Sequence, residues 1–293
     1  MTTMEALLHQ VMLGISNGAI YGGVALALVM IFKSTHHVNF AQGELAMFTT
    51  YVSWTLIQAG VPYWAAFALT LMFAFALAAA IQGLILQRVQ HAPVLVVVIV
   101  FIGLLIFLNS MASWIFGTTI KPFPSPFAVD AWYGTAYFSP HQVGMTVVTL
   151  ATLAAVYGFF RYTRLGLAMR AAAINPISSR LVGVRVDLML ALGWGFAGLL
   201  GAVAGMMAAP MFYLAPDMMS GILVYALAAA LLGGIDNPWG APIGGFIVGV
   251  AENLAGSYLV GTQIRLSVAL LIIVVVLLFK PSGLFGRKSV VRV

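Results

Sequence analysis

The sequence predicts an all-α, polytopic integral membrane bundle of about nine transmembrane helices, within a range of eight to ten. Of its 293 residues, 62% are hydrophobic and only 7% are charged, whereas soluble domains carry about 25% charged residues. Long apolar segments recur along the whole chain. Because the charged side chains are too few to cover a water-exposed surface, lipid must be the solvent for most of the molecule.

The span positions follow from the thickness of the bilayer, because a hydrocarbon core of about 30 Å requires about 20 helical residues. The first apolar segment is long enough to remain as a helix, and no basic region of a cleavable signal precedes it. The seventh segment is short and follows Pro216 and Asp217, so we expect a broken or tilted span there. The predicted spans are 11–32, 40–58, 65–86, 95–116, 141–160, 188–209, 218–235, 242–259 and 265–280.

The basic residues predict the orientation, because Lys and Arg concentrate in short cytoplasmic loops. With nine spans and an external N-terminus, all but Lys121 and Arg265 of the 13 Lys and Arg fall on the cytoplasmic side. If segment 218–235 did not cross, the Arg-rich loop 161–187 would face outward. We therefore predict a cytoplasmic C-terminus and one transmembrane domain over 1–293. The cytoplasmic basic residues are Lys33, Arg88, Arg161, Arg164, Arg170, Arg180, Arg185, Lys280, Arg287, Lys288 and Arg292.

Composition also excludes several classes of protein. The absence of Cys removes disulfides, thiolate nucleophiles and Cys-based metal sites. His36 and His37 are adjacent and cannot share a helix face, so we expect no metal site. The net charge of +6 contains no basic run that could follow a nucleic-acid backbone, and no nucleic acid is expected. The sequence has no Gly-x-x-x-x-Gly-Lys-Ser/Thr phosphate loop, so any ATP must be held by another chain.

Glycines four residues apart lie within the predicted spans, where small residues let two helices approach closely. We expect ordinary helix packing at these positions, and the alternative is sliding between two states. The pairs are Gly14/Gly18/Gly22, Gly201/Gly205, Gly240/Gly244 and Gly245/Gly249.

A first polar interruption covers residues 34–44, between the first two spans. Asn39 is predicted to cap the following helix, and Glu44 falls in its first turn, near the positive end of the helix dipole. One interpretation is a well-capped cytoplasmic hairpin. The other is a broken helix whose free backbone groups face a solute path, since irregular backbone at membrane depth is tolerated only beside protein or a cavity.

A second interruption, Gly233–Pro242, lies between the seventh and eighth predicted spans. Its Gly and Pro content predicts helix ends on both flanks. Its placement resembles that of the first interruption and suggests an internal repeat, although the residues themselves do not repeat. Glu252 lies within a span, where an ionisable side chain faces the bundle interior or a cavity. We favour a buried structural hydrogen bond for Glu252 over a solute contact.

Two loops have a distinctive composition. The external loop 117–140 is rich in Pro and aromatic residues, which predicts anchoring at the membrane surface, with docking of an extracytoplasmic partner as the alternative. In loop 161–187, Asn175-Pro176 predicts an N-cap followed by Pro at the first helical position, and Gly183 predicts the helix end. Leu167, Ala171 and Ile174 recur at helical spacing and predict a second short helix before it. Such a short helix can fit a groove in another protein.

Four ordered motifs stand out: Asn39–Glu44; Gly166–Ala171 with Asn175-Pro176 and Leu181–Val184; Leu232–Ile235 with Gly240–Gly245; and the tail Lys280–Arg287. Together they resemble the branched-chain amino acid permeases of ATP-binding-cassette importers, the LivH-like membrane subunits. The likeness runs from about residue 11 to 288. Gln42 stands where the family usually has His, and Ser179 stands where a small apolar residue is common.

The resemblance implies a bacterial inner-membrane importer of branched-chain or other hydrophobic amino acids. It implies a second permease subunit, two cytoplasmic ATPases that hold ATP and Mg²⁺, and a periplasmic substrate-binding protein, with no cofactor or catalysis in this chain. The residues expected to couple the chain to the ATPases are Arg170, Asn175, Pro176, Leu181 and Gly183. Our hypothesis for the translocation path is that it includes Asn39, Gln42, Gly43, Glu44, Gly234, Asp236 and Glu252.

Three alternatives remain at the level of sequence. Related permeases that carry urea or short-chain amides resemble the chain equally well at these motifs. A secondary transporter driven by an ion gradient is expected to carry intramembrane acidic relays, for which Glu44 and Glu252 are the candidates. An intramembrane enzyme is disfavoured because His-Glu-x-x-His and Asp-rich metal motifs do not occur.

Overall fold

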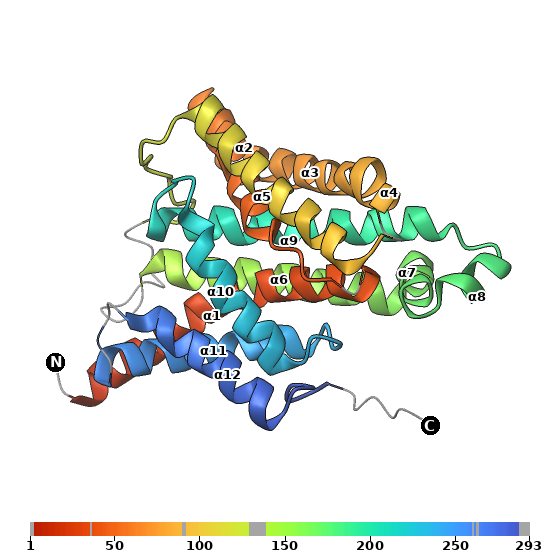
Figure 1. The fold of residues 1–293 in the computed structure, drawn as a ribbon. Coiled ribbons are helices and arrows are strands. Elements are labelled where there is room, and N and C mark those ends of the chain that lie inside the picture. The colour runs from red at the N-terminus through yellow and green to blue at the C-terminus, as the bar shows by residue number, and fades with distance from the viewer. Residues whose placement is uncertain are drawn as a thin grey trace. The chain divides into compact units, whose positions relative to one another are not determined.

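The computed structural model describes residues 3–35, 37–89, 92–128, 139–259, 261 and 264–286 (Figure 1). Within these ranges the regular secondary structure is helical, and the only β-type pairing is an isolated bridge between Lys121 and Leu214. Several predictions fall outside the described residues: those on His36, on the external-loop aromatics Trp132, Tyr133, Tyr137 and Phe138, and on the tail residues Arg287, Lys288 and Arg292.

All nine predicted segments are helical. The seventh is a single continuous helix, so the predicted break is absent from it. The third continues through a π-helical turn, η1 (Gln82–Leu86), into α4 (Gln87–Val89). The nine helices are α1 (Thr3–Thr35), α2 (Gln42–Gln58), α3 (Tyr63–Ile81), α5 (Val94–Phe116), α6 (Pro140–Tyr162), α9 (Val186–Phe212), α10 (Met218–Gly233), α11 (Gly240–Tyr258) and α12 (Arg265–Phe279).

Five of these helical segments are long and apolar enough to cross a membrane: α1, α3 with its continuation to Val89, α5, α6 and α9. Helices α10 and α12 are apolar but shorter. The polytopic all-α class is thereby confirmed, whereas crossing by the other four helices stays a prediction.

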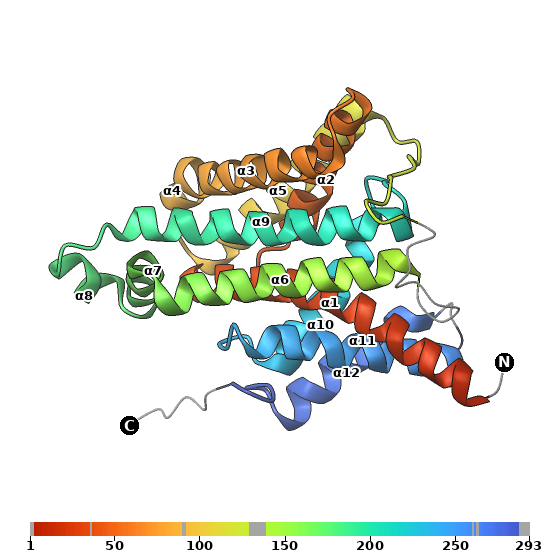
Figure 2. The same ribbon diagram turned by 180° about the vertical axis from the view of Figure 1, so that it is seen from behind.

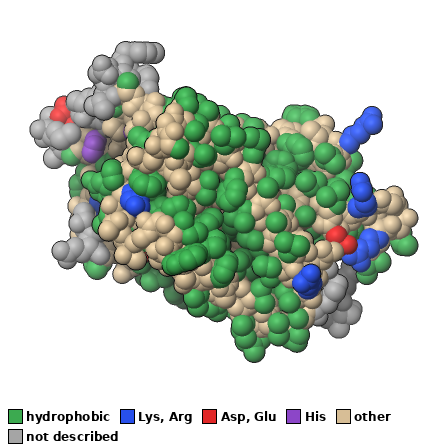
Figure 3. Space-filling view, turned by 90° about the horizontal axis from the view of Figure 1, so that it is seen from above, with side chains coloured by type: hydrophobic (Ala, Val, Ile, Leu, Met, Phe, Trp, Pro, Cys, Tyr) green, Lys and Arg blue, Asp and Glu red, His purple; other side chains and the backbone are tan. Residues whose placement is uncertain are grey.

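Large apolar side chains are exposed on the outer faces of these helices. On α5, Leu95 is 69% exposed and Ile106 is 57% exposed. Figure 3 shows hydrophobic side chains spread across the face in view among backbone and other side chains, with few charged ones. Such faces suit contact with lipid, because a soluble protein rarely exposes contiguous apolar surface of this extent.

The chain divides into two compact units. The first unit comprises Met1–Val29, Phe127–Val147 and Gly221–Val293, and the second comprises Met30–Pro126 and Val148–Ser220. Each unit draws on segments far apart in the sequence, so neither is a continuous stretch of chain.

In the first unit, α1 packs against α11 through glycines. A Cβ added to Gly18 would lie 2.8 Å from the carbonyl oxygen of Gly245, and one added to Gly249 would lie 2.4 Å from that of Gly14. No side chain fits between these backbones. The predicted close packing at Gly14, Gly18, Gly245 and Gly249 is therefore confirmed.

In the second unit, α9 packs against α2 and α3, and both ribbon views show α9 running beside α3 (Figures 1 and 2). A Cβ on Gly198 would lie 2.6 Å from the carbonyl oxygen of Ala74 on α3. A Cβ on Gly205 would lie 2.8 Å from the carbonyl oxygen of Ala46 on α2. Small residues on α9 thus hold α2 and α3 close to it.

Candidate functional site

The described residues between α1 and α2, 37–41, are not helical, and Asn39 and Ala41 among them are buried. Asn39 is fully buried, and its side-chain oxygen accepts a hydrogen bond from the amide of Ala41 at 3.0 Å. The N-cap of α2 is Ala41, which makes no side-chain capping bond. The prediction that Asn39 caps α2 is therefore wrong, because its side chain binds an amide that precedes the helix.

The first turn of α2 carries its polar side chains into the interior of the second unit. Gln42 is fully buried, and its Nε2 donates to the carbonyl oxygen of Ala197 on α9 at 2.9 Å. Glu44 is 7% exposed, and its Oε2 accepts from Nδ2 of Asn109 on α5 at 3.1 Å. Gly43 between them is also buried. This burial favours irregular backbone packed within protein over a hairpin in water.

Asn109 is a site residue that the sequence analysis missed. Its Nδ2 also donates to the carbonyl oxygen of Pro216 at 2.9 Å, so one amide group joins α2, α5 and the connection between α9 and α10. A sequence signal did exist, since Asn109 is the only amide side chain in the apolar segment 95–116. Polar side chains at such positions usually face the bundle interior.

Glu252 lies in the first unit and is 3% exposed. The hydroxyl of Tyr21 donates to its Oε2 at 3.3 Å, and Nη1 of Arg265 lies 3.9 Å from its Oε1. The Tyr21 ring stacks on Tyr225 at a centroid distance of 4.8 Å. Glu252 therefore has structural partners on α1 and α12, including an arginine that the sequence analysis assigned only to the external surface.

The second interruption contacts the C-terminal segment 280–286. The amide of Leu284 donates to the carbonyl oxygen of Leu232 at 2.7 Å, and that of Phe285 to Gly233 at 3.2 Å. Gly234 has a φ of +105°, and a Cβ on Gly283 would lie 2.5 Å from its Cα. Two of the four motifs therefore meet here. Asp236 in the same turn is exposed, and this turn and the Asn39–Glu44 region belong to different compact units.

The loop 161–187 forms two short helices, α7 (Arg164–Ile174) and α8 (Pro176–Leu181). The side chain of Asn175 accepts from the amide of Ser178 at 2.9 Å, and Pro176 is the first helical residue, as predicted. Gly183 has a φ of +85°. The amides of Gly183 and Val184 donate to the carbonyls of Arg180 and Ser179, both at 3.0 Å, which is the Schellman arrangement of a helix end.

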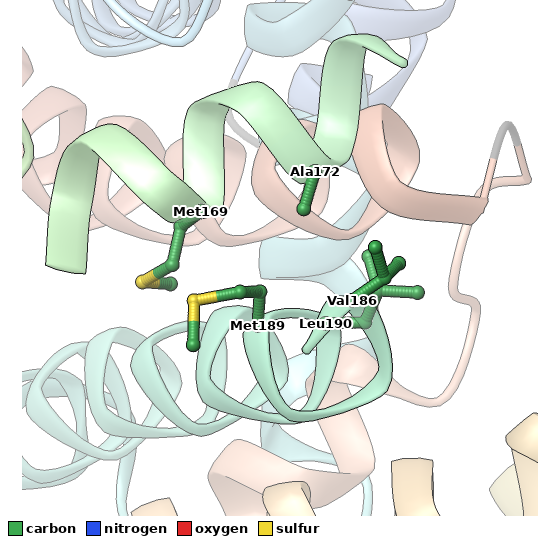
Figure 4. Close-up of a cluster of buried hydrophobic side chains, with 5 residues drawn as sticks. All are labelled: Met169, Ala172, Val186, Met189 and Leu190. Atoms are coloured by element: carbon green, nitrogen blue, oxygen red, sulfur yellow. The ribbon is translucent and has the colours of Figure 1, made fainter. Parts of the chain in front are cut away.

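Helix α7 is held against the start of α9 by a small apolar cluster (Figure 4). Its members are Met169 and Ala172 of α7 and Val186, Met189 and Leu190 of α9. The residues whose spacing predicted this helix do not form that contact, since Leu167 is 61% and Ile174 is 76% exposed. The helix itself is confirmed, but it turns those apolar side chains outward.

An apolar surface is consequently exposed on and around α8, and we call it the α8 surface. It consists of Ile174, Ile177, Leu181 and Val182, each at least 75% exposed. Arg170 and Arg180 lie on the same two helices and are also exposed, with Arg180 3.3 Å from Asp187. Contiguous exposed apolar residues rimmed by charges are typical of a protein-binding site.

Residues 11–279 match the family described as "Branched-chain amino acid transport system / permease component". The chain is 33% identical over 98% of its length to the high-affinity branched-chain amino acid transport system permease protein LivH of Salmonella typhimurium, covering 97% of that protein. It is 29% identical to the corresponding protein BraD of Pseudomonas aeruginosa, with 98% of each chain covered. A structure of PsaBC from Streptococcus pneumoniae in complex with Fab aligns with 95% of this chain and 92% of that chain, at a TM-score of 0.45 and 14% identity.

Proposed function

Because this chain belongs to the branched-chain amino acid transport permease family, we propose that it is the membrane permease subunit of an ATP-driven importer of branched-chain amino acids. The observation that supports this most strongly is the 33% identity to LivH of Salmonella typhimurium, in an alignment that covers 98% of the chain. A transport subunit of this family provides a route through the membrane, and the energy for transport comes from partner chains.

The partners are two cytoplasmic ATPases, which hold ATP and Mg²⁺, a second permease subunit and a periplasmic substrate-binding protein. The α8 surface is the docking site for one ATPase. Its apolar side chains fit a groove in another protein, and the caps at Asn175 and Gly183 hold α8 in shape without help from a partner.

A continuous set of contacts leads from α8 to the first turn of α2. Asn175 is both the C-cap residue of α7 and the N-cap residue of α8, so the two helices are joined at a single residue. Helix α7 packs on α9 through Met169 and Met189, and α9 binds Gln42 through the carbonyl of Ala197. Closure of the ATPases would displace α8 and α7, and α9 would transmit the displacement to α2.

The first turn of α2 is the part of the translocation path that this mechanism moves. A branched-chain amino acid is a zwitterion with an apolar side chain, so its path requires a few hydrogen-bonding groups in an otherwise apolar lining. Asn39, Gln42 and Glu44 supply such groups within the second unit. In the bacterial inner membrane, the N-terminus faces outward and the C-terminus and α8 face the cytoplasm, in agreement with the distribution of basic residues.

Reconstituted transport tests this function. The chain is purified with its co-expressed partner subunits, inserted into liposomes and supplied with the binding protein. We expect uptake of leucine, isoleucine and valine that requires ATP inside the vesicles and continues when ion gradients are collapsed. Uptake of urea or acetamide in place of the amino acids would establish the amide alternative. Uptake that depends on an ion gradient and not on ATP would overturn the proposal.

A further inference from the structure

The N-terminal end of α2 has donors that lack acceptors. The hydrogen bonds of this turn run from the amide of Ala41 to the side chain of Asn39, from Gln42 to the carbonyl of Asn39, and from Leu45 to that of Ala41. Among the described residues, the amides of Gly43 and Glu44 have no acceptor, although both residues are buried. Helix α2 has 17 residues, and the free amides at the start of a helix of this length attract anions.

A second donor at the same place supports an anionic ligand. Nδ2 of Asn39 is buried and hydrogen-bonds to no described residue, and the whole side chain is 0% exposed. The bond from Ala41 to Oδ1 of Asn39 holds this amide group beside the first turn of α2. A buried donor without an acceptor destabilises the folded state, because its hydrogen bond to water is lost and not replaced. Three such donors together indicate that a further group binds here.

Neighbouring side chains leave these donors free. The carboxylate of Glu44 is the nearest anion in the sequence, but its Oε2 accepts from Asn109 on α5. Nε2 of Gln42 donates to Ala197, while its Oε1 is buried and has no donor among the residues described. The site thus offers donors for a carboxylate and, on Gln42, one acceptor for an ammonium group.

We propose that the first turn of α2 binds the carboxylate of the transported solute through the amides of Gly43 and Glu44 and Nδ2 of Asn39. The inference rests on the proposed function, since an amino acid importer must accommodate this carboxylate inside the membrane. It adds the selective contact. The site favours an amino acid over urea or an amide of the same shape, because only the amino acid presents an anionic carboxylate to these donors.

Ligand binding by the purified complex of permease and ATPases tests the site. The binding protein is omitted so that its own selectivity does not enter. Melting temperature is titrated with leucine and with leucinamide, in which an amide replaces the carboxylate. We expect leucine to stabilise the complex with an apparent dissociation constant at least about tenfold below that of leucinamide, the difference expected from charge-assisted hydrogen bonds. Equal stabilisation by both compounds, or by neither, would overturn the proposal.

The variant Asn39→Asp tests the same contact from the protein side. An aspartate has the shape of asparagine, but its carboxylate would itself accept from the free amides and repel the solute carboxylate. We expect the apparent dissociation constant for leucine to rise at least about tenfold. Gln82→Glu is the matched control: Gln82 is a buried amide of the second unit outside α2 whose Oε1 has no described donor, and this variant should bind leucine as the parent does.

Two outcomes separate the proposals. A complex that does not import leucine contradicts the proposed function. A complex that imports leucine but binds leucinamide equally well contradicts only the carboxylate site. If Asn39→Asp lowers expression, the comparison of leucine with leucinamide on the unaltered complex decides the question alone.

Discussion

At the scale of single residues, the amide of Asn109 on α5 joins two other parts of the second unit. Its amide donates to Glu44 of α2 and to the carbonyl of Pro216 before α10. A carboxylate in a protein interior requires donors, because an unpaired one is far costlier there than in water. The geometry of the α2 turn therefore depends on a residue outside the motif that contains it.

Replacing Asn109 with Leu should destabilise the complex by about 2 kcal/mol, because the variant leaves Glu44 and the Pro216 carbonyl without their donor. The melting temperature of the purified complex measures the effect. Gln82→Leu serves as the control, since no hydrogen bond links Gln82 to the described residues through its side-chain oxygen. A loss of the same size in both variants would mean that Asn109 contributes only by filling space.

At the scale of secondary-structure elements, the helices are held by two different means. Glycines place α1 against α11 at backbone contact distance, whereas α8 has its own capping bonds and exposes Ile177 and Leu181 by at least 75%. Contacts of the first kind resist any added atom. Those of the second kind leave the surface of the helix available to a partner.

The contact between glycines of α1 and α11 predicts that two Gly→Ala substitutions differ in their effect on stability. A Cβ on Gly245 would lie 2.4 Å from the Cα of Gly22, whereas one on Gly103 meets nothing within 4 Å. Gly245→Ala should therefore force α1 and α11 apart and cost roughly 1–3 kcal/mol or more. Gly103→Ala should be neutral or stabilise α5 by up to about 1 kcal/mol. Melting temperatures of the two variants provide the comparison, and similar values would contradict the packing described for α1 and α11.

Two substitutions of Gly183, at the end of α8, should differ in how well they couple ATP hydrolysis to transport. Gly183 has a φ of +85°, a conformation that costs most L-residues roughly 1–2 kcal/mol but is more readily adopted by Asn. Gly183→Leu should lower leucine uptake per ATP hydrolysed while the chain still reaches the membrane. Gly183→Asn should retain most coupling. Unchanged uptake by the Leu variant would count against α8 as the ATPase contact.

At the scale of the whole molecule, the orientation in the membrane can be measured directly because the chain contains no Cys. Single cysteines at Ser178 on α8 and at Thr119 in the loop after α5 are both expected to be accessible, since both residues are exposed. In intact cells lacking an outer membrane, an impermeant maleimide should label Thr119→Cys only. Inverted vesicles should give the opposite result. Labelling of Ser178→Cys from outside would overturn the proposed orientation and the coupling role together.

The helices were predictable from sequence to a greater extent than the contacts between them. Lipid restricts a spanning chain to apolar helices, so segment length alone located all nine, and Asn175-Pro176 and Gly183 located α8. The partners of the buried polar groups were not predictable. The bond from Gln42 to Ala197 joins residues 155 apart in sequence, and the bond from Tyr21 to Glu252 joins residues 231 apart. No periodic pattern specifies such pairs.

The contact between the α10–α11 turn and residues 280–286 has a consequence for the order in which the protein is made. Synthesis proceeds from the N-terminus, so the carbonyls of Leu232 and Gly233 emerge before Leu284 and Phe285, the residues that bind them. The turn is completed only after α12 has been translated. A nonsense mutation just after Phe279 would leave all the described helices in the chain. The carbonyl oxygens of Leu232 and Gly233 would nevertheless lose the amides that donate to them.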